Sequence, residues 1–328
     1  MLKKKMFIGG EWVEALSGEK RSIENPYDAS QVAEVSEGGR EDAKKAIAEA
    51  RKAFDGGWGQ TGRKERQDLL LKLAELIKRD KEELAELESL NTGKTMEESR
   101  WDMDDIYNIF KFYAKLLDND FTEKVQSPIP DSTSLVVKEP IGVCGQISPW
   151  NYPLLQASWK MAPALAAGCT IIMKPSELTP LTTIKVTELA IEAGYPSGVV
   201  NLVLGPGHTV GAEMAENHDV DLISFTGGSF TGRKIMNAAS GNIKKVALEL
   251  GGKNPHLIFE DCDFDTAVDY ALNGVFFHAG QICSAGTRLM VQKSISGRFI
   301  EALKSKMEKI KLGNGFDEGT EMGPVISK

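Results

Sequence analysis

The sequence predicts an α/β fold with a central parallel sheet. From residue 141 onward, apolar runs of strand length alternate with amphipathic runs of helical length. The chain has 328 residues, which exceeds what one hydrophobic core usually organises, so two or more domains are expected. Hydrophobic residues at 41% and charged residues at 26% are typical of a soluble globular protein. Because consecutive parallel strands are joined by helices, helices should cover both faces of the predicted sheet.

The first part of the chain precedes this alternation. Its first forty residues are expected to form short strands, with turns at Gly9-Gly10 and Asn25-Pro26. Helical patterns follow over residues 40–54, 64–90 and 101–117. The section 121–140 contains the strand-like run Leu135-Val136-Val137.

The alternating part supplies the strands of the predicted sheet. Strands are expected over residues 141–147, 170–173, 199–204, 222–225 and 246–250. Helices are expected between them over residues 154–167, 182–193 and 230–239. A further strand at 256–259 and a helix at 264–277 begin a second α/β region.

Charge and cysteine usage exclude several classes of protein. A net charge of -8 and a pI near 5.3 argue against a nucleic-acid surface, and no segment approaches the length needed to cross a bilayer. The run Lys3-Lys4-Lys5 precedes too short an apolar stretch for a signal peptide. The four cysteines show no C-x-x-C pair and the histidines lack metal-ligand spacing. We expect a reduced, cytoplasmic compartment, no disulfide framework and no metal site.

Two segments carry the strongest chemical signal. Cys283 lies in FFHAGQICSAGTR (276–288), and Glu249 lies 34 residues upstream in LELGGKNP (248–255). Both resemble the signature segments of the aldehyde dehydrogenase superfamily, over essentially the whole chain and closest to its betaine-aldehyde and aminoaldehyde members. The resemblance implies that Cys283 is the nucleophile and Glu249 the general base. The remaining cysteines fit buried structural thiols.

A third segment, PWNYP (149–153), follows the first strand of the alternating part. In the family its asparagine and the backbone N–H of the cysteine form the oxyanion hole, which implies this role for Asn151 and Cys283. Taken alone, Asn151 beside a proline would be a turn residue, and Glu249 an exposed carboxylate at the end of a strand.

The cofactor is expected to be NAD. Segment TGGSFTG (226–232) follows a strand and opens a helix, where Gly227, Ser229 and Gly232 would let a pyrophosphate approach the helix N-terminus. Gly228 departs from the family pattern, which often has serine there.

The resemblance also implies that Lys174 and Glu177 reach ribose hydroxyls and that Trp150 contributes to the site. Glu177 would repel a 2′-phosphate, which favours NAD over NADP.

Two other glycine-containing segments do not fit nucleotide motifs. Residues 205–211 have the last glycine one position late for a dinucleotide fingerprint, so a turn between strand and helix is expected there. Residues 91–95 contain Gly-Lys-Thr without the upstream glycine of a phosphate loop.

Aromatic residues suggest a substrate. Tyr152 and Trp159 are seven residues apart, which would place them on one helical face. In betaine-aldehyde and aminoaldehyde dehydrogenases, matching aromatics line the substrate tunnel, and aromatic faces attract quaternary ammonium groups. Phe277 stands where some betaine-aldehyde enzymes have tryptophan, and His278 where many members have asparagine. The resemblance implies oxidation of betaine aldehyde to glycine betaine. Core packing of the aromatics, and an aliphatic or ω-amino aldehyde as substrate, are the alternatives.

The resemblance also implies a domain plan. Residues 1–120 and 141–250 would form the NAD-binding domain of Rossmann-like type, and residues 121–140 a small β segment for oligomerisation. Residues 251–328 would form the N-terminal part of an incomplete α/β catalytic domain, because family members continue beyond the corresponding point. We expect the complete enzyme to be a homo-oligomer, dimer or tetramer, acting on a small-molecule aldehyde. A catalytically silent dinucleotide-binding fragment and a cysteine-dependent esterase are the competing hypotheses.

Overall fold

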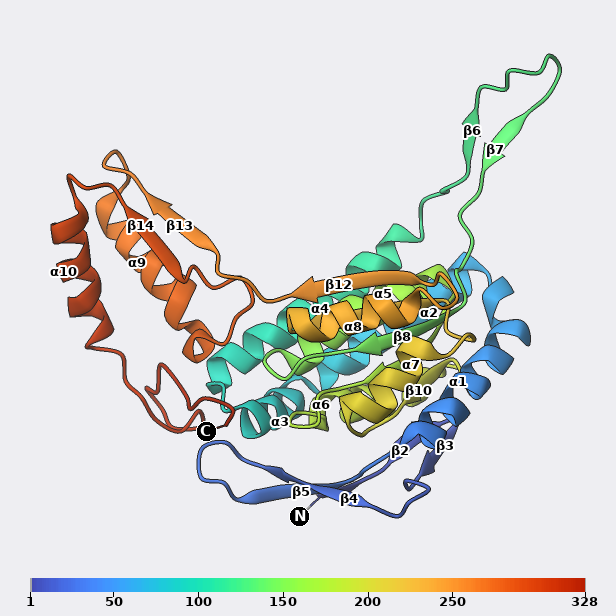
Figure 1. Ribbon diagram of the computed structural model, residues 1–328, viewed down its shortest axis with the longest axis horizontal. Helices are drawn as coiled ribbons and strands as arrows, with labels where there is room; N and C mark the ends of the chain where they lie inside the picture. Colours follow the sequence, from blue (N-terminus) through green and yellow to red (C-terminus); the bar gives the residue numbers. More distant parts are fainter. Residues whose placement is uncertain (1, 328) are drawn as a thin grey trace.

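The computed structural model describes residues 2–327, and its centre is a seven-stranded sheet in the order β12-β11-β8-β9-β10-β2-β3 (Figure 1). Five of these strands run parallel, as the alternating pattern predicted. They are β8 (Val143–Ile147), β9 (Thr170–Lys174), β10 (Val200–Leu202), β11 (Leu222–Gly227) and β12 (Lys245–Leu250).

The order of the parallel strands reverses at β8. This strand pairs with β9 on one side and with β11 on the other. The chain therefore builds one half of the sheet as β8-β9-β10 and the other half as β11-β12. In open parallel sheets such a reversal leaves a crevice at the carboxyl ends of the strands, where ligands bind.

The strands of the lead-in divide between two sheets. β2 (Met6–Ile8) and β3 (Glu11–Val13) extend the main sheet in antiparallel fashion beyond β10. β1 (Leu2–Lys4), β4 (Lys20–Glu24) and β5 (Gln31–Ser36) form a separate three-stranded sheet. The strand-rich lead-in is confirmed, but its contribution to the main sheet was not predicted, because a strand of three residues does not specify its partner.

Helices cover both faces of the main sheet. One group, α2 to α6, packs together on one side, whereas α1, α7 and α8 lie on the other (Figure 1). The bounds of the first group are α2 (Arg63–Arg79), α3 (Lys81–Thr92), α4 (Met96–Leu116), α5 (Pro153–Ala167) and α6 (Leu181–Ala193). The second group is α1 (Arg40–Asp55), α7 (Ala212–Glu216) and α8 (Ser229–Ala239).

The helical stretch 64–90 is two helices. Asp80 lies between α2 and α3 with φ -96° and ψ 20°, outside helical geometry. Its carboxylate accepts from Arg79 Nε at 2.6 Å. Leucines on both sides of the break are buried, among them Leu73 and Leu84, so the apolar spacing continued through a change of direction.

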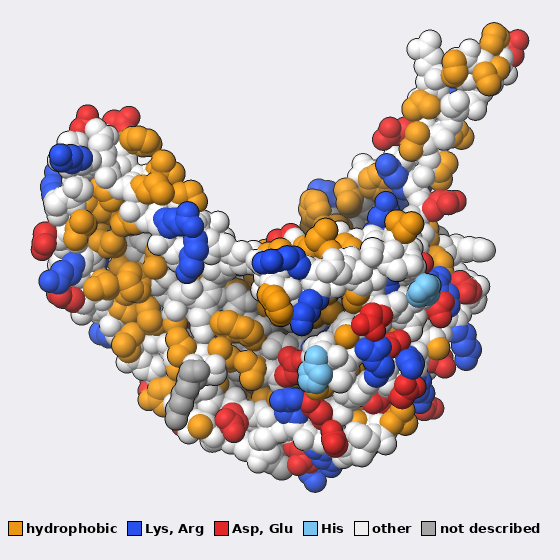
Figure 2. All heavy atoms as spheres, in the orientation of Figure 1, with side chains coloured by type: hydrophobic (Ala, Val, Ile, Leu, Met, Phe, Trp, Pro, Cys, Tyr) orange, Lys and Arg blue, Asp and Glu red, His pale blue; other side chains and the backbone are white. Residues whose placement is uncertain are grey.

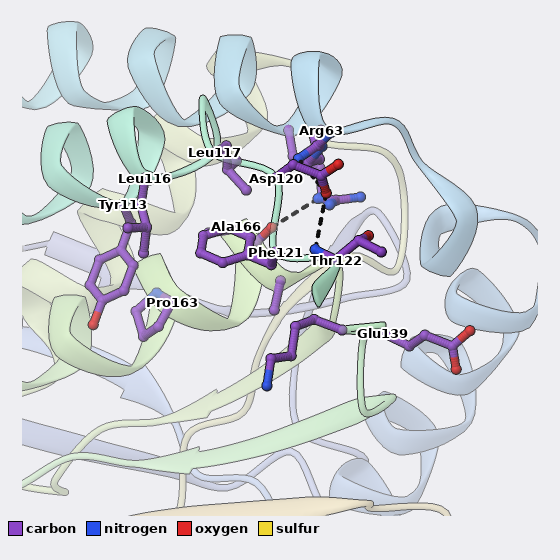
Figure 3. A pocket seen from close by; sticks show the side chains of 13 residues that line it. Arg63, Tyr113, Leu116, Leu117, Asp120, Phe121, Thr122, Glu139, Pro163 and Ala166 are labelled. Carbon is purple, nitrogen blue, oxygen red and sulfur yellow. Dashed lines mark hydrogen bonds and ion pairs between the residues drawn. The ribbon is translucent and has the colours of Figure 1, made fainter. Parts of the chain in front are cut away.

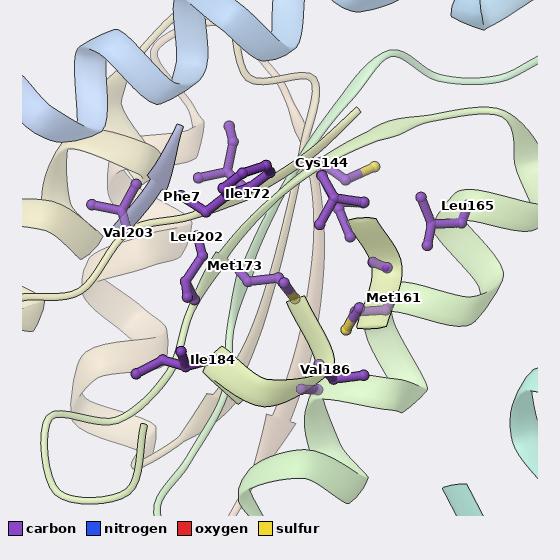
Figure 4. Close-up of a cluster of buried hydrophobic side chains, with 14 of the residues drawn as sticks. Phe7, Cys144, Met161, Leu165, Ile172, Met173, Ile184, Val186, Leu202 and Val203 are labelled. Atoms are coloured by element: carbon purple, nitrogen blue, oxygen red, sulfur yellow. The ribbon is translucent and has the colours of Figure 1, made fainter. Parts of the chain in front are cut away.

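The main core fills the space between the sheet and its helices. Figure 4 shows side chains of α5 and α6 directed onto β8, β9 and β10. The residues labelled there are all buried: Phe7, Cys144, Met161, Leu165, Ile172, Met173, Ile184, Val186, Leu202 and Val203. This apolar burial stabilises the sheet and the loops at its carboxyl ends.

A two-stranded hairpin projects from the body (upper right in Figure 1). It consists of β6 (Glu123–Val125) and β7 (Ser134–Val136), with Ile129 at 66% exposure near its tip. A surface pocket of about 430 Å³ lies where the hairpin leaves the body (Figure 3). Its lining includes Phe121 and Pro163, and none of the predicted site residues contributes to it.

The last part of the chain forms a separate α/β unit. β13 (Pro255–Ile258) and β14 (Arg288–Val291) pair in parallel, and α9 (Phe264–Phe276) and α10 (Ser296–Met307) pack beside them. Its small core consists of Ile258, Val268, Ala271 and Phe299. Figure 2 shows hydrophobic side chains over the surface of this unit, where Leu257, Phe259 and Tyr270 are exposed.

Neither membrane spans nor metal clusters are found in the described part. Within residues 2–327, no helix has both the length and the apolarity to cross a bilayer. The same residues include no group of three or more His, Cys, Asp or Glu side chains placed to hold a metal ion.

A buried ion cluster joins the helices to the C-terminal unit. Lys94, in the turn between α3 and α4, is fully buried and pairs with Asp102 of α4 and with Glu88 of α3 at 3.5 Å. Burial raises the pKa of Asp102 to about 6 against the opposing effect of Lys94.

Backbone from the C-terminal segment packs on this turn. Met96 N–H donates to Gly315 O at 3.0 Å. A Cβ atom at Gly315 would collide with Lys94 O, and one at Gly323 would collide with Gly93 O.

Removing Lys94 should destabilise the protein strongly. Lys94→Ala would leave two buried carboxylates without their cation, which costs about 3–5 kcal/mol in free energy of unfolding. Lys81→Ala is the matched control, because it breaks only the exposed pair with Asp104 and should cost at most about 1 kcal/mol. Urea unfolding of both variants measures the difference, and equal losses would contradict the importance of the cluster.

Candidate active site

The loop that carries Cys283 follows α9. A turn over Phe277–Gly280, left-handed at His278 and Ala279, follows the helix, and Cys283 is exposed three residues later. Its backbone carbonyl accepts from Asn254 Nδ2 at 2.9 Å. The other cysteines are less accessible: Cys144 and Cys169 are buried and Cys262 is partly buried. An exposed thiol in a held loop has the access that a nucleophile needs.

Asn151 contacts this loop directly. It lies between β8 and α5, at the point where the strand order reverses. Its Nδ2 donates to Gln281 O at 2.7 Å, two residues before Cys283. An amide NH₂ carries two N–H donors, so the second remains for another acceptor. The structure thus brings Asn151 and the Cys283 loop together, although they are 130 residues apart in sequence.

Glu249 lies at the same edge of the sheet, on β12, and is exposed. Within residues 2–327 no hydrogen bond joins its carboxylate to Cys283. None is required of a base that acts through one water. Its register partner on β11 is Thr226, whose hydroxyl accepts from Lys160 Nζ at 2.7 Å. Burial lowers the pKa of Lys160 to about 8, and the charge of Glu249 opposes this shift.

Lys174 is the last residue of β9, and Glu177 follows three residues later. Lys174 is buried, which lowers its pKa, and its Nζ lies 3.3 Å from Glu177 Oε1. Burial works to raise the pKa of Glu177, but Lys174 and backbone donors outweigh it and hold the pKa below its usual value. Gly207 N–H is one of those donors, at 2.6 Å from Glu177 Oε1.

The N-terminus of α8 directly follows β11 at the carboxyl-end edge of the sheet. Gly227 ends β11, Gly228 is the cap residue, and Ser229 begins the helix; the last two are exposed. Gly232 is buried in α8, where a Cβ atom would meet Leu250 Cδ2 at 3.0 Å. Its role is therefore close packing of α8 on β12. Free N–H groups at this end are available to an anion.

The aromatic residues are placed differently from each other. Tyr152 is the residue before α5, so the prediction that it shares a helical face with Trp159 is wrong, because the helix begins only at Pro153. Tyr152 is 9% exposed; Lys94 Nζ lies 3.8 Å from the centroid of its ring, and His278 meets the ring edge-on. Trp159 is 47% exposed.

The remaining predicted residues also have defined neighbours. Phe277 is half-buried and stacks on Trp101 of α4, with ring centroids 5.9 Å apart. Trp150 lies in the loop before α5, where its backbone carbonyl accepts from Thr179 Oγ1 at 3.2 Å.

Three residues near the site were missed by sequence reasoning. Trp101 is half-exposed and stacks on Phe277, a contact that the helical pattern of residues 101–117 does not indicate. Gly207 begins a π-helical turn (Gly207–Gly211) that contacts Glu177. Glu98 accepts from His278 N at 2.8 Å. Only the position of Gly207, in the turn that follows a predicted strand, could have indicated its place.

Comparisons with known proteins identify a matching family model and similar relatives. A family model described as "Aldehyde dehydrogenase family" matches residues 12–328. A betaine aldehyde dehydrogenase of Bacillus subtilis is 65% identical over 98% of this chain and 66% of its own length. An aminoaldehyde dehydrogenase of Zea mays is 42% identical over 98% of this chain and 65% of its own.

A solved structure shows the same backbone arrangement. Betaine aldehyde dehydrogenase from Staphylococcus aureus, in complex with NAD+, is 56% identical, with a TM-score of 0.98 over 100% of this chain and 65% of that one. The chain thus spans slightly less than two thirds of the length of these relatives.

Lys160 should make stability depend on pH. Its pKa is about 8 when folded and near the ordinary lysine value of 10.5 when unfolded. Between these values the unfolded chain holds the extra proton, so the free energy of unfolding rises with pH, by up to about 1.4 kcal/mol per pH unit.

Lys160→Met should lack the part of the free energy of unfolding that rises with pH because of the lowered pKa of Lys160. Urea unfolding at pH 7.5 and 9.5 should show wild type gaining stability relative to Lys160→Met as pH rises. Lys234→Met, at an exposed lysine of α8, serves as the control. The same pH dependence in all three proteins would show that Lys160 keeps its ordinary titration.

Proposed function

The chain belongs to the aldehyde dehydrogenase family, and we propose that it oxidises an aldehyde to the carboxylic acid with NAD as hydride acceptor. The observation that carries this proposal is the Asn151 amide. It holds the loop of an exposed cysteine with one N–H, and within residues 2–327 its other N–H has no acceptor. The proposed substrate is betaine aldehyde and the proposed product is glycine betaine.

The first step requires a nucleophile and a donor for the resulting oxyanion. The Cys283 thiolate adds to the carbonyl carbon, which becomes tetrahedral and places negative charge on oxygen. The free N–H of Asn151 and the backbone N–H of Cys283 are the proposed donors to that oxygen. Donors fixed before the reaction stabilise the developing charge without reorganisation. Loss of the hydride from this carbon leaves a thioester on Cys283.

NAD, when bound, supplies the acceptor for this hydride. The described residues fit such a dinucleotide at the crevice of the sheet. The open N-terminus of α8, with Gly227 and Ser229, suits the pyrophosphate. Glu177 has its carboxylate held ionised by Lys174, which suits ribose hydroxyls and opposes a 2′-phosphate.

Glu249 is proposed as the base for the second half of the reaction. Hydrolysis of the thioester needs a water that loses a proton as it attacks. The Glu249 carboxylate is exposed near the carboxyl end of β12, where it would accept that proton. Expulsion of the Cys283 thiolate then releases the acid and restores the nucleophile.

The substrate proposal rests on exposed aromatic faces and on the relatives. Trp159 and the Trp101–Phe277 stack present aromatic surface, and rings of this kind attract quaternary ammonium groups. The Bacillus subtilis and Staphylococcus aureus relatives are named betaine aldehyde dehydrogenases. The maize relative is named an aminoaldehyde dehydrogenase, so an ω-amino aldehyde is the second candidate.

The domain plan is proposed on the same basis. Residues 1–120 and 141–250 would bind the cofactor, and residues 251–328 would carry the nucleophile. The hairpin of β6 and β7 would join subunits of a homo-oligomer, because its apolar side chains are exposed. Four free cysteines suit a reduced, cytoplasmic setting.

Cys283→Ala should abolish NADH formation from betaine aldehyde and NAD, measured at 340 nm, because no thioester can form. Cys262→Ala is the matched control and should keep wild-type activity, since that cysteine lies in the same unit but outside the loop. Turnover that survives in Cys283→Ala would refute the nucleophile assignment. NAD binding without turnover in folded wild type would favour the silent-fragment hypothesis.

Trp159→Ala should alter selectivity more than chemistry. Loss of one cation–π face, worth roughly 0.5–2 kcal/mol, should raise KM for betaine aldehyde about 2- to 30-fold. KM for the uncharged substrate propanal should change little. Phe112→Ala is the control, an exposed aromatic of α4 that contacts Tyr113. Equal changes in KM for both aldehydes would argue against recognition of the cation by Trp159.

A further inference from the structure

The turn that precedes Cys283 has an unfavourable backbone conformation. His278 (φ 47°, ψ 44°) and Ala279 (φ 52°, ψ 30°) are left-handed, and Gly280 follows with φ 75°. Residues with a side chain avoid this region because the Cβ atom crowds the backbone. Two such residues in succession persist only where surrounding contacts hold them.

A carboxylate from another part of the chain holds the first of these residues. Glu98 Oε1 accepts from His278 N at 2.8 Å, across 180 residues of sequence. Glu98 belongs to the first turn of α4 and is 5% exposed. A buried, charge-assisted hydrogen bond of this length is among the stronger polar contacts in a protein.

The other oxygen of Glu98 caps its own helix. Thr95 N donates to Oε2 at 2.9 Å and Thr95 Oγ1 at 3.1 Å, while Glu98 N donates back to Thr95 Oγ1 at 3.2 Å. This capping box needs only one acceptor oxygen, and glutamine can supply it. The second contact, to His278, needs a second acceptor, which a carboxylate has and an amide lacks.

The loop is also held further along. Asn151 binds Gln281 O and Asn254 binds Cys283 O. These contacts fix carbonyl groups, whereas Glu98 fixes the amide at the start of the left-handed turn. If that amide were released, Ala279 could relax to right-handed geometry and the direction of the chain toward Cys283 would change.

We propose that Glu98 is a positioning residue for the reaction, which holds the His278–Ala279 turn and thereby sets Cys283 against Asn151. This inference rests on the proposed function. Glu98 touches neither substrate nor cofactor in this role and acts through the His278 amide. Its helix-capping contact with Thr95 is a separate, structural role.

Two variants separate the two roles. Glu98→Gln keeps the size of the side chain and one acceptor for Thr95 N, but turns an amide NH₂ toward a backbone donor. Thr95→Ala removes the capping hydroxyl and keeps both oxygens of Glu98. Glu98→Asp, which keeps the charge but shortens the reach, provides a third variant if Glu98→Gln folds poorly.

Hydrogen exchange and kinetics on the 328-residue chain give the readouts. In Glu98→Gln, amide exchange in the peptide 277–283 should rise about tenfold or more, because the hydrogen bond that protects this turn is lost. With betaine aldehyde and NAD, kcat should fall about tenfold while KM for NAD stays within about twofold. The exchange rate and kcat should both stay near the wild-type values in Thr95→Ala. In Glu98→Asp they should lie between those of wild type and those of Glu98→Gln.

A double variant tests the connection to Asn151. If Glu98 acts by placing Cys283 relative to that amide, the loss in kcat from Glu98→Gln should shrink in an Asn151→Ala background. Full additivity of the two losses would overturn the proposed connection.

Further outcomes would overturn the proposal. Unchanged exchange in Glu98→Gln would show that Glu98 does not hold the turn. If kcat fell in proportion to the melting temperature, and by the same proportion in Glu98→Gln and Thr95→Ala, Glu98 would have a structural role only. A wild-type chain that forms no NADH would refute the proposed function instead, and the exchange comparison would still decide whether Glu98 holds the turn.

Discussion

Burial of the Lys94 ammonium is the constraint on which the arrangement around Cys283 depends. A buried cation must be paired, and Glu88 and Asp102 supply its partners from α3 and α4. This requirement fixes the turn between the two helices, which in turn places Glu98 against the Cys283 loop. The same ammonium lies over the ring of Tyr152 at the start of α5. One ion cluster thus connects the helical layer, the end of β8 and the C-terminal unit.

Much of the fold could be predicted from local pattern. The parallel strands and the helices between them follow from apolar runs of two distinct lengths, and their bounds agree with the structure within a few residues. Pairing was harder. Nothing in the three residues of β2 indicates that β10 is its neighbour. The break at Asp80 was also hidden, because leucine spacing continues while the backbone changes direction.

The same distinction holds for the site: local sequence pattern predicts where some of its residues lie, but not the contacts between distant segments. Asn151, Glu249, Lys174 and Gly227 lie at or just after strand ends, and the carboxyl ends of parallel strands meet at one edge of a sheet. Their common location therefore followed from order alone. Trp101 and Glu98 act across α4 and the C-terminal unit. A helical pattern shows which side chains face inward, but not which distant loop they will meet. The predicted common face of Tyr152 and Trp159 is wrong for a local reason, because Tyr152 lies just outside the helix and helical spacing does not apply to it.

The backbone contacts of Gly315 and Gly323 bear on the order of folding. Both glycines rest on the carbonyl groups of Gly93 and Lys94, so their docking surface exists only after α3 and α4 have formed and the turn has closed. The contact also spans more than two hundred residues of sequence, and contacts of such separation form late because the loop entropy must first be overcome. The C-terminal unit is therefore expected to dock in a late step, and the loop of Cys283 would reach its place only after α3, α4 and the turn between them have formed.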